Sequence, residues 1–205
     1  SMELALHSHA MLRNAYLLDD KELQKRFVPL LALTEAFMPD STLTIDGNFF
    51  AGLSLLSWAK TDLEEQVALL EQANSIIDKF DTWTADCVEN FEHKLLMLQA
   101  EKAGLLGKHI EAQALYSKAI QSAQDAEYLS CEALANELYA KYWQSQNQAQ
   151  AAELFIQKAY SLYKQWNANA KLKQIEQTWP QVSFIADKHS QFDDLDLETM
   201  LEVNQ

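Results

Sequence analysis

The stretch GKHIEAQALYSKAI, residues 107–120, recurs in degenerate form as NQAQAAELFIQKAY, residues 147–160. The two copies align without a gap at an offset of 40 residues, and Ala112, Lys118 and Ala119 each meet the same residue type in the second copy. An internal repeat of this length is typical of proteins that stack pairs of helices, whose units are about 34 to 47 residues long. The repeat therefore predicts an architecture of stacked helices.

The similarity reaches further upstream. At the same offset of 40 residues Leu98 pairs with Leu138. An earlier copy, NFFAGLSLLSWA at residues 48–59, parallels NFEHKLLMLQAE at residues 90–101 at an offset of 42. Because the similarity covers more than one helix length, we interpret the unit as a helix pair.

Apolar periodicity within a copy indicates which face of each helix is buried. In residues 147–166, Phe155, Ala159, Leu162 and Trp166 fall at i, i+4, i+7 and i+11. This spacing forms one stripe along a helix of 3.6 residues per turn. It predicts that Phe155, Leu162 and Trp166 are buried against the neighbouring helix.

Glycine and proline are scarce in this chain. It has four glycines and three prolines in 205 residues, against usual frequencies of about 7% and 5%. Since these residues mark turns, the composition favours long helices with short connections. Together with the repeat, it predicts an all-α fold, a tetratricopeptide-like α-solenoid of antiparallel helix pairs over residues 1–180.

The expected helices number about nine. They cover residues 3–18, 20–38, 45–59, 62–80, 87–106, 108–126, 129–146, 148–166 and 168–178. Pro29 should kink the second helix, because proline lacks the backbone donor and clashes with the preceding turn.

Local signals mark several helix ends. Residues 61–64 and 86–89 both fit a capping box, in which the first side chain bonds an unpaired amide and a glutamate three residues later bonds back. Gly107 and the pair Trp179-Pro180 indicate helix ends.

Charge and cysteine content restrict the classes of partner. Sixteen basic and thirty acidic residues give a net charge of −14, which repels phosphate backbones and argues against a nucleic-acid partner. No run of about 18 apolar residues occurs, so no membrane span is expected.

Two unpaired cysteines favour reduced thiols and a cytoplasmic location. Ser1-Met2 resembles a cloning remnant, so we expect the chain to be part of a longer one.

The stretch DCVENFEHK, residues 86–94, is the strongest candidate for a metal site. On a helix Cys87 and His93 lie about 240° apart and cannot bind one ion together. Glu89 and His93 share a face, while Cys131 aligns with a phenylalanine of the preceding unit and so occupies a core position. Zinc needs three or four ligands. We therefore interpret the stretch as a helix start with a Glu89–His93 surface pair.

The remaining candidates are no stronger. His7 and His9 face different sides of a helix, and His109 lies at a helix–helix turn. The acidic run 193–196 with Glu198 lacks the glycine and the ligand spacing of a calcium loop. Phosphate-binding, serine-hydrolase, zinc-protease and kinase motifs are absent from the sequence. We therefore assign no catalytic, cofactor-binding or metal-binding residue and expect no cofactor.

Four blocks carry a resemblance to a known family: CVENFEHKLLMLQAE, EALANELYAKYW, AAELFIQKAYSLYKQWNANAKLKQIEQTWP and LDLETMLEVNQ. They resemble the helical-repeat region of very large bacterial signalling proteins. In these, a serine/threonine-kinase-like domain and a P-loop ATPase precede the region, and a GAF sensor domain and a histidine kinase or other output domain follow it. The resemblance covers about residues 45–205. It implies that residues 181–205 are an acidic C-terminal connector with the start of a signalling helix. Val88 stands where the family commonly has proline.

The resemblance implies a non-catalytic regulatory scaffold in a multidomain bacterial signal-transduction kinase of the two-component type, with protein partners and a cytoplasmic location. The segment itself is not expected to be an enzyme, whereas its parent would be a kinase and ATPase. The alternative is a free-standing tetratricopeptide-type adaptor that binds a partner peptide in its concave groove. A homodimer is left open, and neither a nucleic acid nor a membrane is an expected partner.

Overall fold

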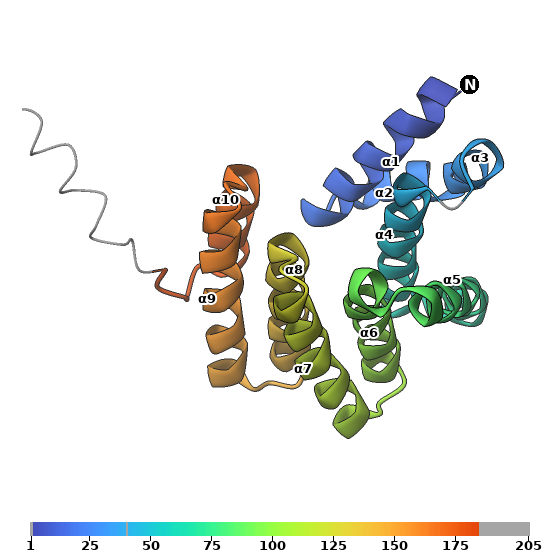
Figure 1. Ribbon diagram of the computed structural model, residues 1–205. Helices are drawn as coiled ribbons and strands as arrows, with labels where there is room; N and C mark the ends of the chain where they lie inside the picture. The colour runs from blue at the N-terminus through green and yellow to red at the C-terminus, as the bar shows by residue number, and fades with distance from the viewer. Residues whose placement is uncertain (1, 40, 185–205) are drawn as a thin grey trace, which may run out of the picture.

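All regular structure that the computed structural model describes is helical, and it describes residues 2–39 and 41–184. The elements, shown in Figure 1, are α1 (Met2–Leu17), α2 (Lys21–Phe27), the 3-10 helix η1 (Val28–Leu30), α3 (Leu31–Phe37), α4 (Thr42–Ala59), α5 (Gln66–Asp86), α6 (Val88–Leu105), α7 (His109–Asp125), α8 (Leu129–Ser145), α9 (Ala149–Gln165) and α10 (Asn169–Thr178). The predicted all-helical fold is confirmed. The nine expected helices are each found, with the segment 20–38 divided in two.

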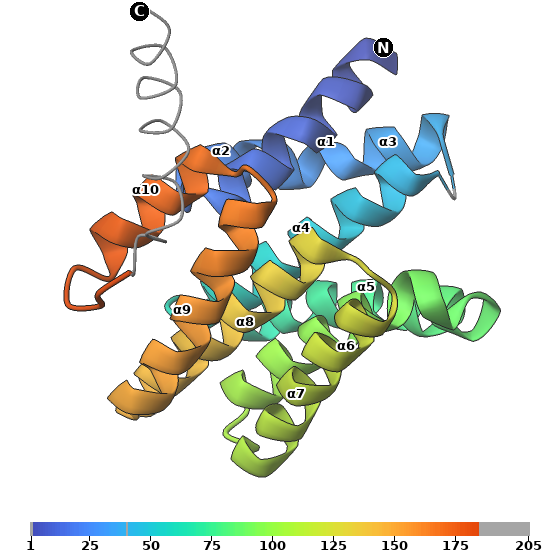
Figure 2. The ribbon, with the colours of Figure 1, turned by 60° about the vertical axis from the view of Figure 1, so that its left-hand side comes forward.

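The helices pack in chain order, and a second set of contacts joins alternate helices. α4 contacts α6 and α6 contacts α8, in addition to the contacts that each makes with the next helix. α1 packs against α2, α3 and α4, and its C-terminal end points toward α8 and α10 (Figures 1 and 2). The row α4, α6 and α8 therefore has α1 at one of its edges.

Three-residue loops of one geometry connect the helices from α6 to α10. The middle residue of each loop has a positive φ: 72° at Gly107 and 58° at Glu127, Asn147 and Asn167. The next amide donates to the carbonyl five residues earlier, which closes a Schellman motif; the pairs are Lys108 with Ala103, Tyr128 with Ala123, Gln148 with Trp143 and Ala168 with Tyr163. One helix and one loop thus make a 20-residue unit, half the offset of the sequence repeat.

Glu127 provides a test of this loop geometry. Left-handed backbone costs a non-glycine residue about 1–2 kcal/mol, whereas glycine adopts it freely. Glu127 is exposed, so Glu127→Gly should raise the free energy of unfolding by about 1 kcal/mol in urea titrations. Glu127→Val should lower it. A Glu127→Gly protein less stable than the parent would contradict the left-handed assignment.

Pro29 has the predicted effect. It lies in the 3-10 turn η1, which separates α2 from α3 within the expected helix 20–38. The missing N–H of proline cannot continue the α-helical bonding pattern, so the chain changes direction there.

Both predicted capping boxes are wrong. Thr61 Oγ1 donates to the carbonyl of Trp58, and Asp62 accepts the amide of Glu65 at 3.1 Å, so this stretch forms a turn before α5 begins. α5 then runs to Asp86, six residues beyond the expected end at 80. Cys87 is therefore the N-cap of α6, and its side chain makes no capping bond. Short polar side chains stabilise a turn at residues 61–65 instead of a helix start.

The buried face of α9 is rotated from the predicted stripe. The fully buried residues are Ala152, Ile156, Ala159 and Tyr163, whereas Phe155, Leu162 and Trp166 are only half-buried. α9 packs between α8 and α10, so the contact buries Ile156 and the Tyr163 ring, while Phe155 packs at its margin against Tyr139 of α8. The prediction that Phe155, Leu162 and Trp166 are buried is therefore wrong.

Packing continues past residue 180, the expected end of the repeat domain. Val182 is buried against α9 and α10, and the ring of Phe184 stacks on Tyr160 with centroids 4.3 Å apart. Residues 181–184 of the expected connector thus lie on the helical body. Residues 185–205 lie outside the described part of the chain.

Candidate functional site

A pocket of about 210 Å³ lies where the last turns of α1 meet α4, α6, α8 and the end of α9. Its walls come from both ends of the described chain, because Arg13 and Leu17 line it from α1 and Trp166 from the C-terminal cap of α9. Short loops and the oblique course of α1 bring these residues together. The pocket is therefore the candidate functional site.

Two cations and one carboxylate line the pocket. Lys94 pairs with Asp46, and its ammonium lies 6.0 Å from the centroid of the Phe49 ring. The guanidinium of Arg13 lies 5.2 Å from the centroid of the Trp166 ring, a cation–π arrangement. Within the described residues Arg13 has neither an ion pair nor a hydrogen-bond acceptor. The pocket thus carries an excess of one positive charge, in a chain whose net charge is −14.

Cys131 lines the same pocket, in line with the predicted core position. Burial raises the pKa of the Cys131 thiol, although Lys94 opposes the shift. The thiolate is the nucleophilic form of cysteine. Cys131 is therefore held in its unreactive form at neutral pH.

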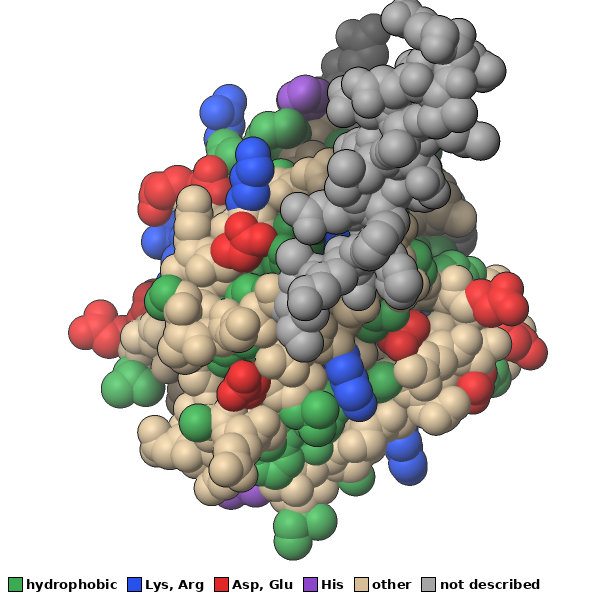
Figure 3. Space-filling view, turned by 90° about the vertical axis from the view of Figure 1, so that its left-hand side faces the viewer, with side chains coloured by type: hydrophobic (Ala, Val, Ile, Leu, Met, Phe, Trp, Pro, Cys, Tyr) green, Lys and Arg blue, Asp and Glu red, His purple; other side chains and the backbone are tan. Residues whose placement is uncertain are grey.

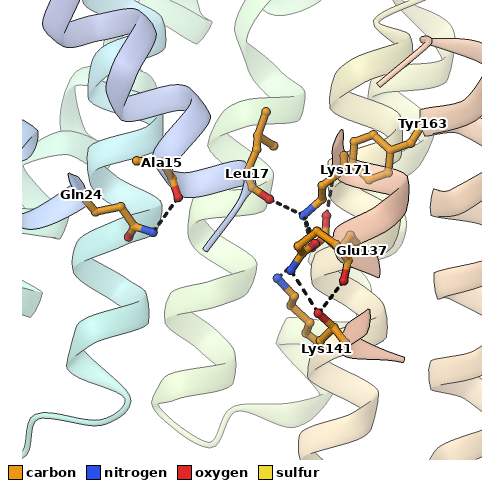
Figure 4. Close-up of polar contacts among 9 residues, drawn as sticks. Ala15, Leu17, Gln24, Glu137, Lys141, Tyr163 and Lys171 are labelled. Atoms are coloured by element: carbon orange, nitrogen blue, oxygen red, sulfur yellow. Dashed lines mark hydrogen bonds and ion pairs between the residues drawn. The ribbon is translucent and has the colours of Figure 1, made fainter. Parts of the chain in front are cut away.

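A buried ion-pair network lies beside the pocket and joins α8, α9, α10 and α1 (Figure 4). The Glu137 side chain is only 2% exposed and accepts bonds from Lys141, Lys171 and the Tyr163 hydroxyl, each 2.8 Å long. Lys171 Nζ also donates to the carbonyl of Leu17 at the end of α1, at 2.6 Å. Burial alone would raise the pKa of Glu137, but Lys141 and Lys171 hold it at about 2.

A second buried carboxylate lies on α6, the helix next to α8 in the row α4, α6 and α8. Glu101 of α6 accepts the Tyr116 hydroxyl and pairs with Lys60. Burial and the carboxylates of Glu101 and Glu137 raise the pKa of Tyr16, in the last turn of α1, well above its ordinary value. The end of α1 therefore rests over buried charges of both α6 and α8.

The structure separates the residues of the strongest sequence candidate. His93 is buried and stacks on Tyr128, with ring centroids 4.7 Å apart, and neither ring nitrogen has a hydrogen-bond partner. Cys87 lies elsewhere, where it accepts a bond from Asn90. The predicted Glu89–His93 surface pair is therefore wrong. Tyr128 comes from the loop before α8, so one helix pattern could not reveal that it covers His93.

The other candidates are dispersed. His7 is exposed, and His9 is buried with an unpaired Nε2. His109 begins α7, and its Nδ1 lies 3.1 Å from the Tyr142 hydroxyl. The acidic run 193–196 and Glu198 lie outside the described residues. Within residues 2–39 and 41–184, no group of three or more His, Cys, Asp or Glu side chains is placed to hold a metal ion.

Surface charge on the α9 and α10 side is mixed. Figure 3 shows basic and acidic side chains interspersed on the part of this face that is drawn in colour. No helix in the described part of the chain has the length and apolar character needed to span a bilayer.

Sequence reasoning missed the residues that matter most at the site. Glu137 and Lys141 are spaced i, i+4 in the otherwise apolar segment ELYAKYW, and this spacing was an available signal. Arg13 and Lys171 gave no signal, and Trp166 gave only the apolar spacing of its helix, because their partners at the site come from distant helices.

Comparisons with models of protein families, with curated proteins and with solved structures found no match to this chain.

Proposed function

We propose that this chain is a non-catalytic helical scaffold of a multidomain bacterial signal-transduction kinase, where it mediates contacts between protein domains in the cytoplasm. The observation that carries the proposal is the 20-residue unit of one helix and one Schellman loop between α6 and α10. Regular units of this kind favour a tetratricopeptide-like α-solenoid of antiparallel helix pairs, an architecture that presents extended surfaces to other proteins.

The bond between α10 and the end of α1 supports a role in relay. Lys171 of α10 joins Glu137 of α8 to the last carbonyl of α1. A displacement of α1 would therefore change the surroundings of a buried carboxylate and of α10. Such a body suits a segment that lies between an input domain and an output domain.

The experiment uses the full-length reading frame that contains this sequence. Residues 197–204 have helical apolar spacing in the sequence, although they lie outside the described residues. Inserting seven residues after Leu201 roughly restores helical phase, whereas inserting two rotates the downstream chain by about 200°. Autophosphorylation of the full-length protein should therefore survive the seven-residue insertion better than the two-residue one.

The two insertions are matched in position and control for each other. Equal activity of both proteins would mean that the tail is a passive tether, and the relay role would be withdrawn. A reading frame without kinase and ATPase domains would remove the multidomain proposal itself.

The alternative proposal is a free-standing adaptor that binds a partner peptide. The pocket between α1 and the row α4, α6 and α8 favours it, because the pocket could receive one side chain of such a peptide. A reading frame that holds the helical region alone is the outcome expected for an adaptor.

A further inference from the structure

We propose that the pocket between α1, α8 and the end of α9 binds a small organic carboxylate. Its carboxylate group would bind Arg13, and its apolar group would pack on Phe49 and Phe50. The inference concerns a ligand site and does not depend on the proposed signalling function.

The guanidinium of Arg13 supplies the recognition of charge. It lines the pocket and lies over the Trp166 ring, and none of its N–H groups donates to an acceptor in the described part of the chain. A guanidinium stacked on an aromatic face still presents its edge, which matches a carboxylate with two parallel hydrogen bonds. The other cation is already engaged, since Lys94 pairs with Asp46. One carboxylate therefore balances the charge of the pocket.

The rest of the lining selects for an apolar group. Phe49, Phe50 and Leu134 provide hydrocarbon surface on the side of α4 and α8. A volume of about 210 Å³ equals the liquid volume of about seven water molecules. A single ring or a short aliphatic chain fits this space. Inorganic phosphate would form hydrogen bonds with Arg13 but would leave the apolar side chains of the pocket in contact with water. We therefore favour a carboxylate with a hydrocarbon part.

The position of the pocket gives such a ligand a structural effect. Arg13 belongs to α1, whereas Trp166 caps α9. A carboxylate bound to the free edge of Arg13 would add contacts within the pocket that α1 shares with α8 and the end of α9. A ligand that binds only the folded chain also stabilises it by mass action.

Isothermal titration of the full chain with benzoate and hexanoate tests the proposal. At least one of them should bind saturably with a Kd of about 1 mM or below. Benzamide, which has nearly the shape of benzoate without its charge, should bind at least about tenfold more weakly, and so should inorganic phosphate. In ¹H–¹⁵N spectra, the indole N–H signal of Trp166 should move with benzoate.

Arg13→Gln should weaken benzoate binding by about tenfold or more. Arg26→Gln is the matched control, because Arg26 also lies over an aromatic ring, 5.6 Å from the Phe27 centroid, but does not line the pocket. It should bind benzoate like the parent. Circular dichroism checks the fold of each variant. If Arg13→Gln does not fold, Arg13→Lys replaces it, because lysine keeps the positive charge but cannot donate two parallel hydrogen bonds to a carboxylate.

Two results would overturn the proposal. One is the absence of saturable binding of both carboxylates at concentrations up to about 10 mM. The other is equal benzoate binding by the parent and the folded Arg13 variant, which would place any binding outside this pocket.

Discussion

Lys171→Met is expected to lower the free energy of unfolding by about 3–5 kcal/mol. The Lys171 side chain is 5% exposed, and its ammonium bonds Glu137 and the Leu17 carbonyl. Its removal leaves the buried Glu137 carboxylate with Lys141 and Tyr163 only, and leaves the end of α1 without its donor. Breaking one side of a buried ion pair is costly because the remaining charge stays out of water. Urea unfolding near neutral pH measures the loss.

Lys173→Met is the matched control, since Lys173 lies on α10 only two residues away and is exposed. It should change stability by less than about 0.5 kcal/mol. Adding Glu137→Gln to Lys171→Met should recover part of the loss, because the buried carboxylate is then neutral, while Lys141, which is partly exposed, can be solvated by water. If the Lys171 and Lys173 variants were equally stable, the network would not hold α1 and α10 together.

Acid is expected to destabilise the protein through His93. Burial, assisted by Lys94, lowers the pKa of His93 from 6.5 to about 4, and Asp46 only partly opposes this shift. The unfolded chain therefore takes up a proton near pH 6.5 while the folded chain resists it. The stability is fully present above pH 6.5 and falls as the pH falls to about 4. A pKa difference of about 2.5 corresponds to about 3 kcal/mol over that window.

His93→Phe isolates this contribution, because phenylalanine can still stack on Tyr128 and cannot be protonated. Between about pH 7.5 and pH 5, the parent should lose about 2 kcal/mol more than the variant in urea titrations. His7→Gln removes an exposed imidazole and should keep the acid loss of the parent. Protonation of Glu137, whose folded pKa is about 2, acts only at lower pH. Parallel losses in the parent and His93→Phe would show that another group is responsible.

The features that the sequence predicted well are local ones. Gly107 indicated a helix end because glycine readily adopts the left-handed backbone that a Schellman motif requires. The left-handed conformation of Glu127 was not predicted, because a glutamate gives no such signal. Pro29 broke its helix for an equally local reason.

The features that the sequence did not predict depend on contacts between units. His93 is covered by Tyr128, which lies in another loop. The buried face of α9 is decided by two neighbouring helices, so that Ile156 and Tyr163 are buried in place of Phe155. The Arg13–Trp166 contact joins residues near opposite ends of the described chain. Periodicity within one helix holds no information on these partners.

The bond from Lys171 to the Leu17 carbonyl spans 154 residues of sequence and bears on how the molecule unfolds. In a stack where each helix touches only its neighbours, terminal helices fray independently and folding can start anywhere along the array. Here α10 cannot fray without stripping Glu137 of its partner and freeing the end of α1. α10 is thereby coupled to α1, and the stacked helices gain cooperativity that contacts between neighbours alone do not provide.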